Sequence, residues 1–75
     1  MTTNSLAGHH GQLHSAIISL LRRYGKPLPV GFLARSVGVS TEIVSGCLVE
    51  LQERGVLEVR HINGLEEASL KGSNG

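Results

Sequence analysis

The sequence predicts a small α+β domain in which three helices precede a two-stranded β-hairpin. In three segments between about Gln12 and Arg54, apolar residues recur at helical spacing. Asn63-Gly64 then separates two segments of alternating apolar and polar residues, which is the strongest short-range signal for a hairpin. A chain of 75 residues fits one domain with a modest core.

Composition narrows the class of protein. The apolar residues, 40% of the chain, are mostly aliphatic, with one Phe, one Tyr and no Trp. The chain therefore offers no aromatic platform for stacking single-stranded bases. A formal net charge of +1 gives no strong attraction to nucleic acid or to an anionic membrane. The single cysteine, and the lack of a signal-peptide pattern or long apolar run, favour an intracellular protein of the cytoplasm, nucleoid or nucleus.

The two ends of the chain differ in composition from its middle. We expect a flexible leader (1–11), a folded domain (12–71) and a flexible tail (72–75), because both ends are rich in Gly, Ser, Thr and Asn. His10 and His14 are four residues apart, a spacing that suits a metal on one helix face. A mobile leader without a metal is favoured, since no carboxylate or cysteine lies near them in the sequence.

The first helix is expected at 12–25, with Gly25 as its stop. The residues that share its apolar face are Leu13, Ile17, Leu20, Leu21 and Tyr24. Pro27 and Pro29 then require extended backbone, so Leu28 is a candidate for a short strand that pairs with the hairpin. Pro29 can open the second helix at its first position. The inward residues of that helix are expected to be Phe32, Leu33 and Val37.

The third helix is expected from Ser40 to Arg54. The Ser40 hydroxyl is a good N-cap, and Gly55 ends the helix. Its buried stripe is Val44, Cys47, Leu48 and Leu51. After it, the two-residue loop fixes the hairpin register, from Ile62 opposite Leu65 to Leu57 opposite Leu70. The core face of the hairpin is then Leu57, Val59, Ala68 and Leu70.

The residues at the turns and cores of these elements form a motif. They are Leu33-Ala34, Val37-Gly38-Val39-Ser40, Val44-Ser45, Leu48, Leu51 and Gly55-Val56-Leu57. With the order of elements, this motif resembles the winged helix-turn-helix family over about 60 residues. The resemblance implies a DNA-reading third helix and a hairpin wing, although a fold does not by itself fix a function.

The resemblance also implies which residues would bind a partner. On the outer face of the third helix they are Thr41, Glu42, Ser45, Gly46 and Val49, and on the wing Arg60, His61 and Asn63. Arg35 in the second helix, and Arg60 with His61, are best placed for phosphates. Glu67 opposite Arg60 weakens that role. Position 46 departs from the family, which often carries a long polar residue there, and the helix has no Arg, Lys, Asn or Gln before Gln52.

Three carboxylates on this helix have structural interpretations. Glu42 in the first turn is stabilised by the positive helix end, and acceptance of a hydrogen bond from cytosine is the alternative. Glu50 is expected to pair with Arg54, four residues on, and Glu53 to be solvated. Gly46 costs about 1 kcal/mol relative to alanine; it indicates either close packing inside the domain or the close approach of a partner.

Two functions remain open. One is a DNA-binding transcription regulator that acts as a dimer on double-stranded DNA. The other is a protein-docking module that uses the outer face of the third helix and the wing tip at Ile62 and Leu65. Neither requires a cofactor, a metal or a membrane. An enzyme is not expected, because Cys47 belongs to the buried stripe and no phosphate loop, carboxylate pair or Ser/His/Asp pattern is seen.

Overall fold

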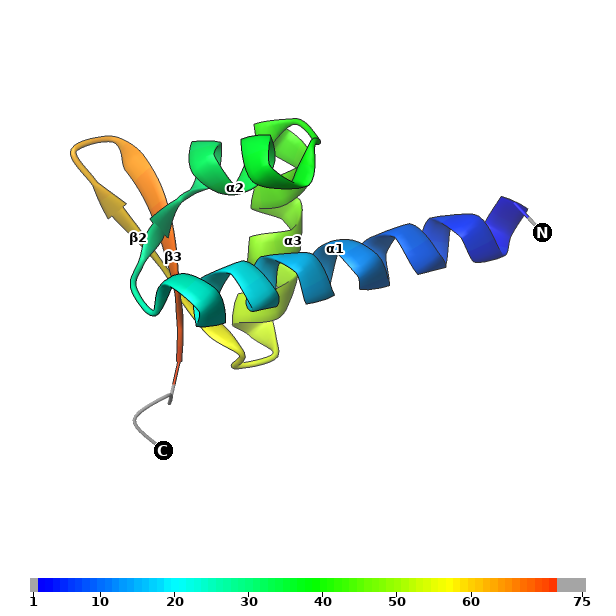
Figure 1. The fold of residues 1–75 in the computed structure, drawn as a ribbon, viewed down its shortest axis with the longest axis horizontal. Coiled ribbons are helices and arrows are strands. Elements are labelled where there is room, and N and C mark those ends of the chain that lie inside the picture. Colours follow the sequence, from blue (N-terminus) through cyan, green and yellow to red (C-terminus); the bar gives the residue numbers. More distant parts are fainter. Residues whose placement is uncertain (1, 72–75) are drawn as a thin grey trace.

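Three helices and a small antiparallel sheet follow one another in the order that the sequence predicts (Figure 1). This computed structural model describes the backbone of residues 2–71 and the side chains of residues 11–71. The elements are α1 (Thr2–Tyr24), β1 (Leu28–Pro29), α2 (Val30–Val37), α3 (Thr41–Glu53), β2 (Leu57–Ile62) and β3 (Leu65–Leu70). The strand order is β1-β3-β2, so the α+β prediction and the short strand at Leu28 are both confirmed.

Helix α1 is longer than predicted. It begins at Thr2, and its N-terminal half projects beyond the other elements (Figure 1). The first helix was expected only from residue 12, and the backbone of residues 2–11 is helical as well; the flexible leader (1–11) stays a prediction. Gly11 does not stop the helix, because a glycine weakens a helix without removing a backbone hydrogen bond. The domain boundary at residue 12 stays a prediction, and the predicted tail (72–75) lies outside the described residues.

Two aromatic residues predicted to face inward are exposed instead. Tyr24 is 47% exposed and Phe32 is 37% exposed, and their rings meet edge to face at 5.3 Å. Tyr24 is the last residue of α1, beyond its buried residues Ile17 and Leu21. In α2 the buried residues are Leu33 and Ala34, so Phe32 lies at the flank of the apolar face. The two rings cover one another outside the core.

The connection from α2 to α3 is a tight turn of three residues. Gly38 ends α2 in the left-handed region at φ 87°, and its N–H donates to the Ala34 carbonyl. The Ser40 hydroxyl accepts from the Ile43 N–H at 3.3 Å, as its predicted N-cap role requires. No single helix within residues 2–71 is long and apolar enough to cross a membrane; α2 and α3 together have the length and composition, but are bent by 110°. A bend of this size is typical of a helix-turn-helix.

The hairpin has the predicted register. Leu57 pairs with Leu70 and Ile62 with Leu65, and on its other side β3 pairs Ala68 with Leu28 of β1. Asn63 (φ 53°) and Gly64 (φ 80°) both have positive φ, as a type I′ turn requires.

Every element contributes to one apolar core. Its buried residues are Ile17, Leu21, Leu28, Leu33, Ala34, Val44, Cys47, Leu48, Leu51, Leu57 and Ala68. Four of these come from α3 and form the stripe predicted from the sequence. The stripe fixes which side of α3 faces the solvent.

The orientation of α3 predicts the stability of two neighbouring variants. Leu48 is fully buried and Val49 is 49% exposed. Leu48→Ala should lower the free energy of unfolding by about 2–5 kcal/mol, because it leaves a cavity in the core. Val49→Ala should change it by less than about 0.5 kcal/mol. Urea denaturation of both variants measures this; equal losses would show that α3 is rotated from the position described.

The conformation of the Asn63-Gly64 turn predicts a local loss of hairpin stability when Gly64 is replaced. Gly64→Val should destabilise the hairpin, because a β-branched residue is strained at positive φ. Asn63→Gly is the matched control and should preserve it. Amide hydrogen exchange should show protection lost in Leu57–Leu70 and largely retained in α1 and α3. Unchanged protection in the Gly64→Val hairpin would contradict the type I′ turn.

Candidate nucleic-acid interface

The outer face of α3 is the side opposite its buried stripe. At 3.6 residues per turn, the residues centred on that side lie within an arc of about 60°. They are Glu42, Gly46, Val49 and Glu53, and all four are exposed. Thr41 is exposed in the first turn. Ile43, 47% exposed, and Val49 add apolar area, so this face combines carboxylates with aliphatic groups.

Gly46 lies at the centre of this face. A Cβ built on it would have no atom within 4 Å among its surroundings. The interpretation that this glycine permits close packing inside the domain is therefore wrong, because α2 packs against the buried side of α3 instead. The remaining interpretation from the sequence is that the glycine keeps the helix backbone open to an approaching partner.

The wing is attached to α3 by a carboxylate. The Ser45 hydroxyl donates to Glu66 Oε1 at 2.9 Å, and His61 Nε2 lies 3.8 Å from Glu66 Oε2. Glu66 retains 21% side-chain exposure, whereas His61 retains 71%. The hydrogen bond to Glu66 uses the hydroxyl hydrogen of Ser45. The exposed His61 imidazole lies on the other side of the same carboxylate. Because Glu66 separates the hydroxyl from the imidazole, the order differs from a catalytic triad, in which the histidine contacts the serine.

The hairpin register predicted from the two-residue loop puts Glu66 opposite His61, but it does not reveal the contact of Glu66 with α3. A signal was available in the alternation of β3, where Leu70 and Ala68 face the core and Glu66 continues the same face. A carboxylate on a core face requires a hydrogen-bond partner. The partner itself could not be read from the sequence, because Ser45 is 21 residues away.

The opposite flank of α3 is attached to α1. His14 Nε2 lies 2.8 Å from Glu50 Oε1, and the His14 side chain is only 12% exposed. The predicted Glu50–Arg54 pair is not formed: among the side chains of residues 11–71, the basic groups within 4.0 Å of a carboxylate are two histidines, His14 beside Glu50 and His61 beside Glu66. The histidine competes successfully because α1 crosses α3 at this point and holds the imidazole in place.

The remaining predicted site residues lie on other elements. Arg35 is exposed on the last turn of α2. Arg60 alternates with His61 and so projects from the other face of the hairpin. Glu67 is its register partner, yet within residues 11–71 no carboxylate lies within 4.0 Å of the Arg60 guanidinium. Asn63 occupies the turn. Thr41, Glu42, Ser45, Gly46 and Val49 thus share α3, and Glu66 joins Ser45 to His61 of the wing. Arg35, Arg60 and Asn63 lie on α2, on the other face of the hairpin and in its turn.

Cys47 is buried on the inner side of α3. Burial raises the pKa of its thiol, and the negative charge of Glu50 raises that pKa further. The thiol is therefore held in its protonated, weakly nucleophilic form at neutral pH.

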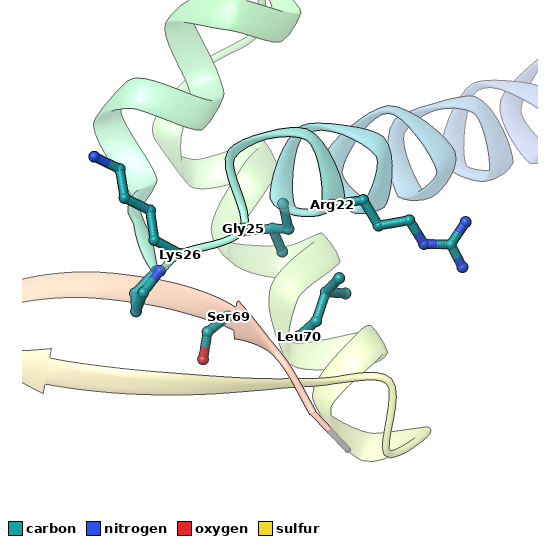
Figure 2. A pocket seen from close by; sticks show the side chains of 7 residues that line it. Arg22, Gly25, Lys26, Ser69 and Leu70 are labelled. Carbon is teal, nitrogen blue, oxygen red and sulfur yellow. The ribbon is translucent and has the colours of Figure 1, made fainter. Parts of the chain in front are cut away.

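A hollow of about 390 Å³ lies between the end of α1 and β3. Its lining residues are Leu21, Arg22, Gly25, Lys26, Pro27, Ser69 and Leu70 (Figure 2). The Arg22 and Lys26 head groups point to opposite sides, away from the Gly25–Leu70 centre. They do not converge on a point where one anion could contact both.

Comparison with known proteins shows a likeness in structure. No protein-family model and no curated protein matches the sequence. The Zalpha domain of Carassius auratus PKZ, solved in complex with Z-DNA, has a TM-score of 0.74 at 21% identity, over 83% of this chain and 97% of that chain. The antimony-specific transcriptional repressor AntR has a TM-score of 0.68 at 24% identity, over 91% of this chain and 68% of that chain. HlyU from Vibrio cholerae has a TM-score of 0.64 at 21% identity, over 99% of this chain and 85% of that chain.

These likenesses and the arrangement of elements identify the fold as that of a winged helix-turn-helix domain. The resemblance first indicated by the sequence motif is thereby confirmed. In this fold α2 and α3 form the helix-turn-helix, and the β2–β3 hairpin is the wing.

The attachment of the wing can be tested by a double-mutant cycle. Ser45→Ala and Glu66→Ala should each destabilise the domain, and the two losses should be coupled by about 1 kcal/mol, because either change removes the same hydrogen bond. Ser36→Ala, at an exposed serine of α2, is the control and should show no coupling with Glu66→Ala. Thermal unfolding measures all the variants; additive effects of Ser45→Ala and Glu66→Ala would contradict the contact.

Proposed function

We propose that this protein binds double-stranded DNA through the outer face of α3 and the adjoining wing, and that it acts as a transcription regulator. One observation carries the proposal. The second helix of a helix-turn-helix has its whole outer face exposed, beside a wing held in place by Glu66. The Zalpha structure with Z-DNA and the repressor AntR, which share the fold, support the same class of partner.

The dimensions of α3 suit the major groove. That groove is about 12 Å wide and admits an α-helix. Gly46 presents open backbone at the middle of α3, so the helix can approach the base edges closely. Phosphate contacts then come from neighbouring elements, as helix-turn-helix proteins commonly arrange them. The candidates are Arg35 on α2, Arg54 at the end of α3, and Arg60 on the wing.

So few cations give weak binding for one copy of the domain. Each neutralised phosphate contributes about −0.9 to the slope of log affinity against log salt. Three arginines therefore supply little affinity at physiological salt. Dimerisation on two half-sites is the means by which helix-turn-helix proteins overcome this limit, and we propose it here.

A protein-docking module is the second candidate, and a specific observation favours it. Four exposed aliphatic residues lie on α3 and at the wing tip: Ile43, Val49, Ile62 and Leu65. Glu42 and Glu53 on the same helix repel phosphates. An apolar surface with carboxylates fits a partner protein that carries cations among apolar residues.

Replacing Gly46 with arginine separates the two functions. On a DNA-binding face, Gly46→Arg should hold or raise affinity for random duplex DNA and steepen the salt slope by about one unit. Ser19→Arg adds the same charge on an exposed position of α1 and should leave the slope unchanged. Fluorescence anisotropy over a salt series provides the measurement.

The stability of Gly46→Arg should equal or exceed that of the parent, because arginine is the better helix former and meets no neighbour. An absence of salt-dependent binding to duplex DNA by the parent protein would refute the proposed function. If a protein partner were bound instead and Gly46→Arg abolished that binding, the docking function would be supported.

A further inference from the structure

The N-terminal half of α3 presents few groups that can read a base. In helix-turn-helix proteins this half contacts the base edges. Here the Ser45 hydroxyl donates its hydrogen to Glu66, and Gly46 has no side chain. Glu42 is the only long polar side chain in this half of the helix, and it has no hydrogen-bond or ion-pair partner among residues 11–71.

The position of Gly46 leaves Glu42 uncovered. Side chains on a helix lean toward its N-terminus, so a side chain at position 46 would lie over the turn that carries Glu42. The space around Gly46 is open for at least 4 Å. The carboxylate therefore faces any partner seated on the centre of the outer face.

An ionised carboxylate only accepts hydrogen bonds. In the major groove the donors are the N4 amino group of cytosine and the N6 amino group of adenine; guanine presents only acceptors, and thymine an acceptor and a methyl group. Adenine places its N7 acceptor beside N6, where it repels the second carboxylate oxygen. Cytosine has no such acceptor on its own edge, so it is the base that a carboxylate matches best.

From this geometry, and resting on the proposed DNA-binding function, we infer that Glu42 is a specificity-determining residue that selects a cytosine in the bound duplex. The next exposed side chain along the same face, between Gly46 and Glu53, is apolar. Val49 is seven residues from Glu42, about 10.5 Å along the helix at 1.5 Å per residue, which corresponds to about three base pairs. The valine suits a thymine methyl group at that distance.

The dual environment of Glu42 explains why a carboxylate is tolerated on a DNA-reading helix. Without DNA, the positive end of α3 stabilises it in the first turn. In the groove, the same charge discriminates against guanine, whose O6 and N7 atoms repel it. The carboxylate thus contributes selectivity, while the attraction to phosphates is left to cations on other elements.

Selection from a randomised duplex library tests the inference. The parent protein should enrich cytosine at one position by about tenfold over guanine, the size expected of one good base contact. Glu42→Gln should move the preference at that position from cytosine to adenine, because a glutamine side chain both donates and accepts and so matches N6 and N7 of adenine. Glu42→Asp keeps the acceptor and should keep cytosine.

The matched control is Glu53→Gln, which removes an exposed carboxylate from the last turn of the same face and should leave the selected base unchanged. Salt-dependent binding without cytosine enrichment, or the same enriched base in the parent and in a folded Glu42→Gln, would overturn the inference while leaving DNA binding intact. A parent protein that retains no duplex in the selection would overturn the proposed function itself. Glu42→Asp supplies a second folded comparison should Glu42→Gln fail to fold.

Discussion

The packing of the apolar stripe of α3 is the constraint on which the rest of the structure depends. Val44, Cys47, Leu48 and Leu51 bury one side of the helix against α1, α2 and the sheet. Successive side chains of a helix are rotated by about 100° about its axis. A shift of the buried stripe by a single position would therefore expose a different set of side chains on the outer face. The solvent-facing arc of Glu42, Gly46, Val49 and Glu53 is the geometric consequence of that stripe.

Two polar contacts hold the flanks of the same helix. Glu50 is paired with His14 of α1, and Ser45 donates to Glu66 of the wing. Each contact gives a carboxylate a fixed hydrogen-bond partner at one flank of α3. The carboxylates centred on the outer face itself are Glu42 and Glu53.

These contacts also couple the wing and α1 to α3. A partner that engages His61 of the wing and Val49 of α3 meets two elements joined through Glu66, so little ordering is required when it binds. Preorganisation of this kind favours affinity because it reduces the entropy lost on binding. A domain with few cations depends more heavily on such an effect.

Local patterns in the sequence predicted the elements whose geometry is set locally. Asn63-Gly64 fixed the hairpin register because a two-residue loop permits one pairing, and the spacing of Leu48 and Leu51 predicted the buried side of α3. The exposure of Tyr24 and Phe32 could not be predicted from helical periodicity. It depends on which parts of α1 and α2 lie against the core in the assembled fold. The extension of α1 to Thr2 was not predicted, because residues 1–11 are rich in Gly, Ser, Thr and Asn. Such a composition is only weak evidence against a helix that continues from residues 12–24.

The site was predicted less completely than the fold, for a related reason. Periodicity identifies the outer face of α3 but not what its neighbours contact. The contacts outside this periodicity join distant residues: His14 and Glu50 are 36 positions apart, and Ser45 and Glu66 are 21 apart. The first replaces the predicted Glu50–Arg54 pair. The second gives Ser45 a hydrogen-bond partner that the sequence did not predict. Only the assembled fold brings these groups within hydrogen-bond distance.

The central claim is that α3 and the wing together form the surface that receives duplex DNA. Mapping amide chemical shifts by NMR during titration with a random duplex tests it most directly, because the method reports every backbone position at once. The largest changes are expected in two segments, 41–49 of α3 and 60–66 of the wing. Changes centred instead on the hollow formed by Leu21–Pro27 and Ser69–Leu70, or none at saturating DNA, would contradict it.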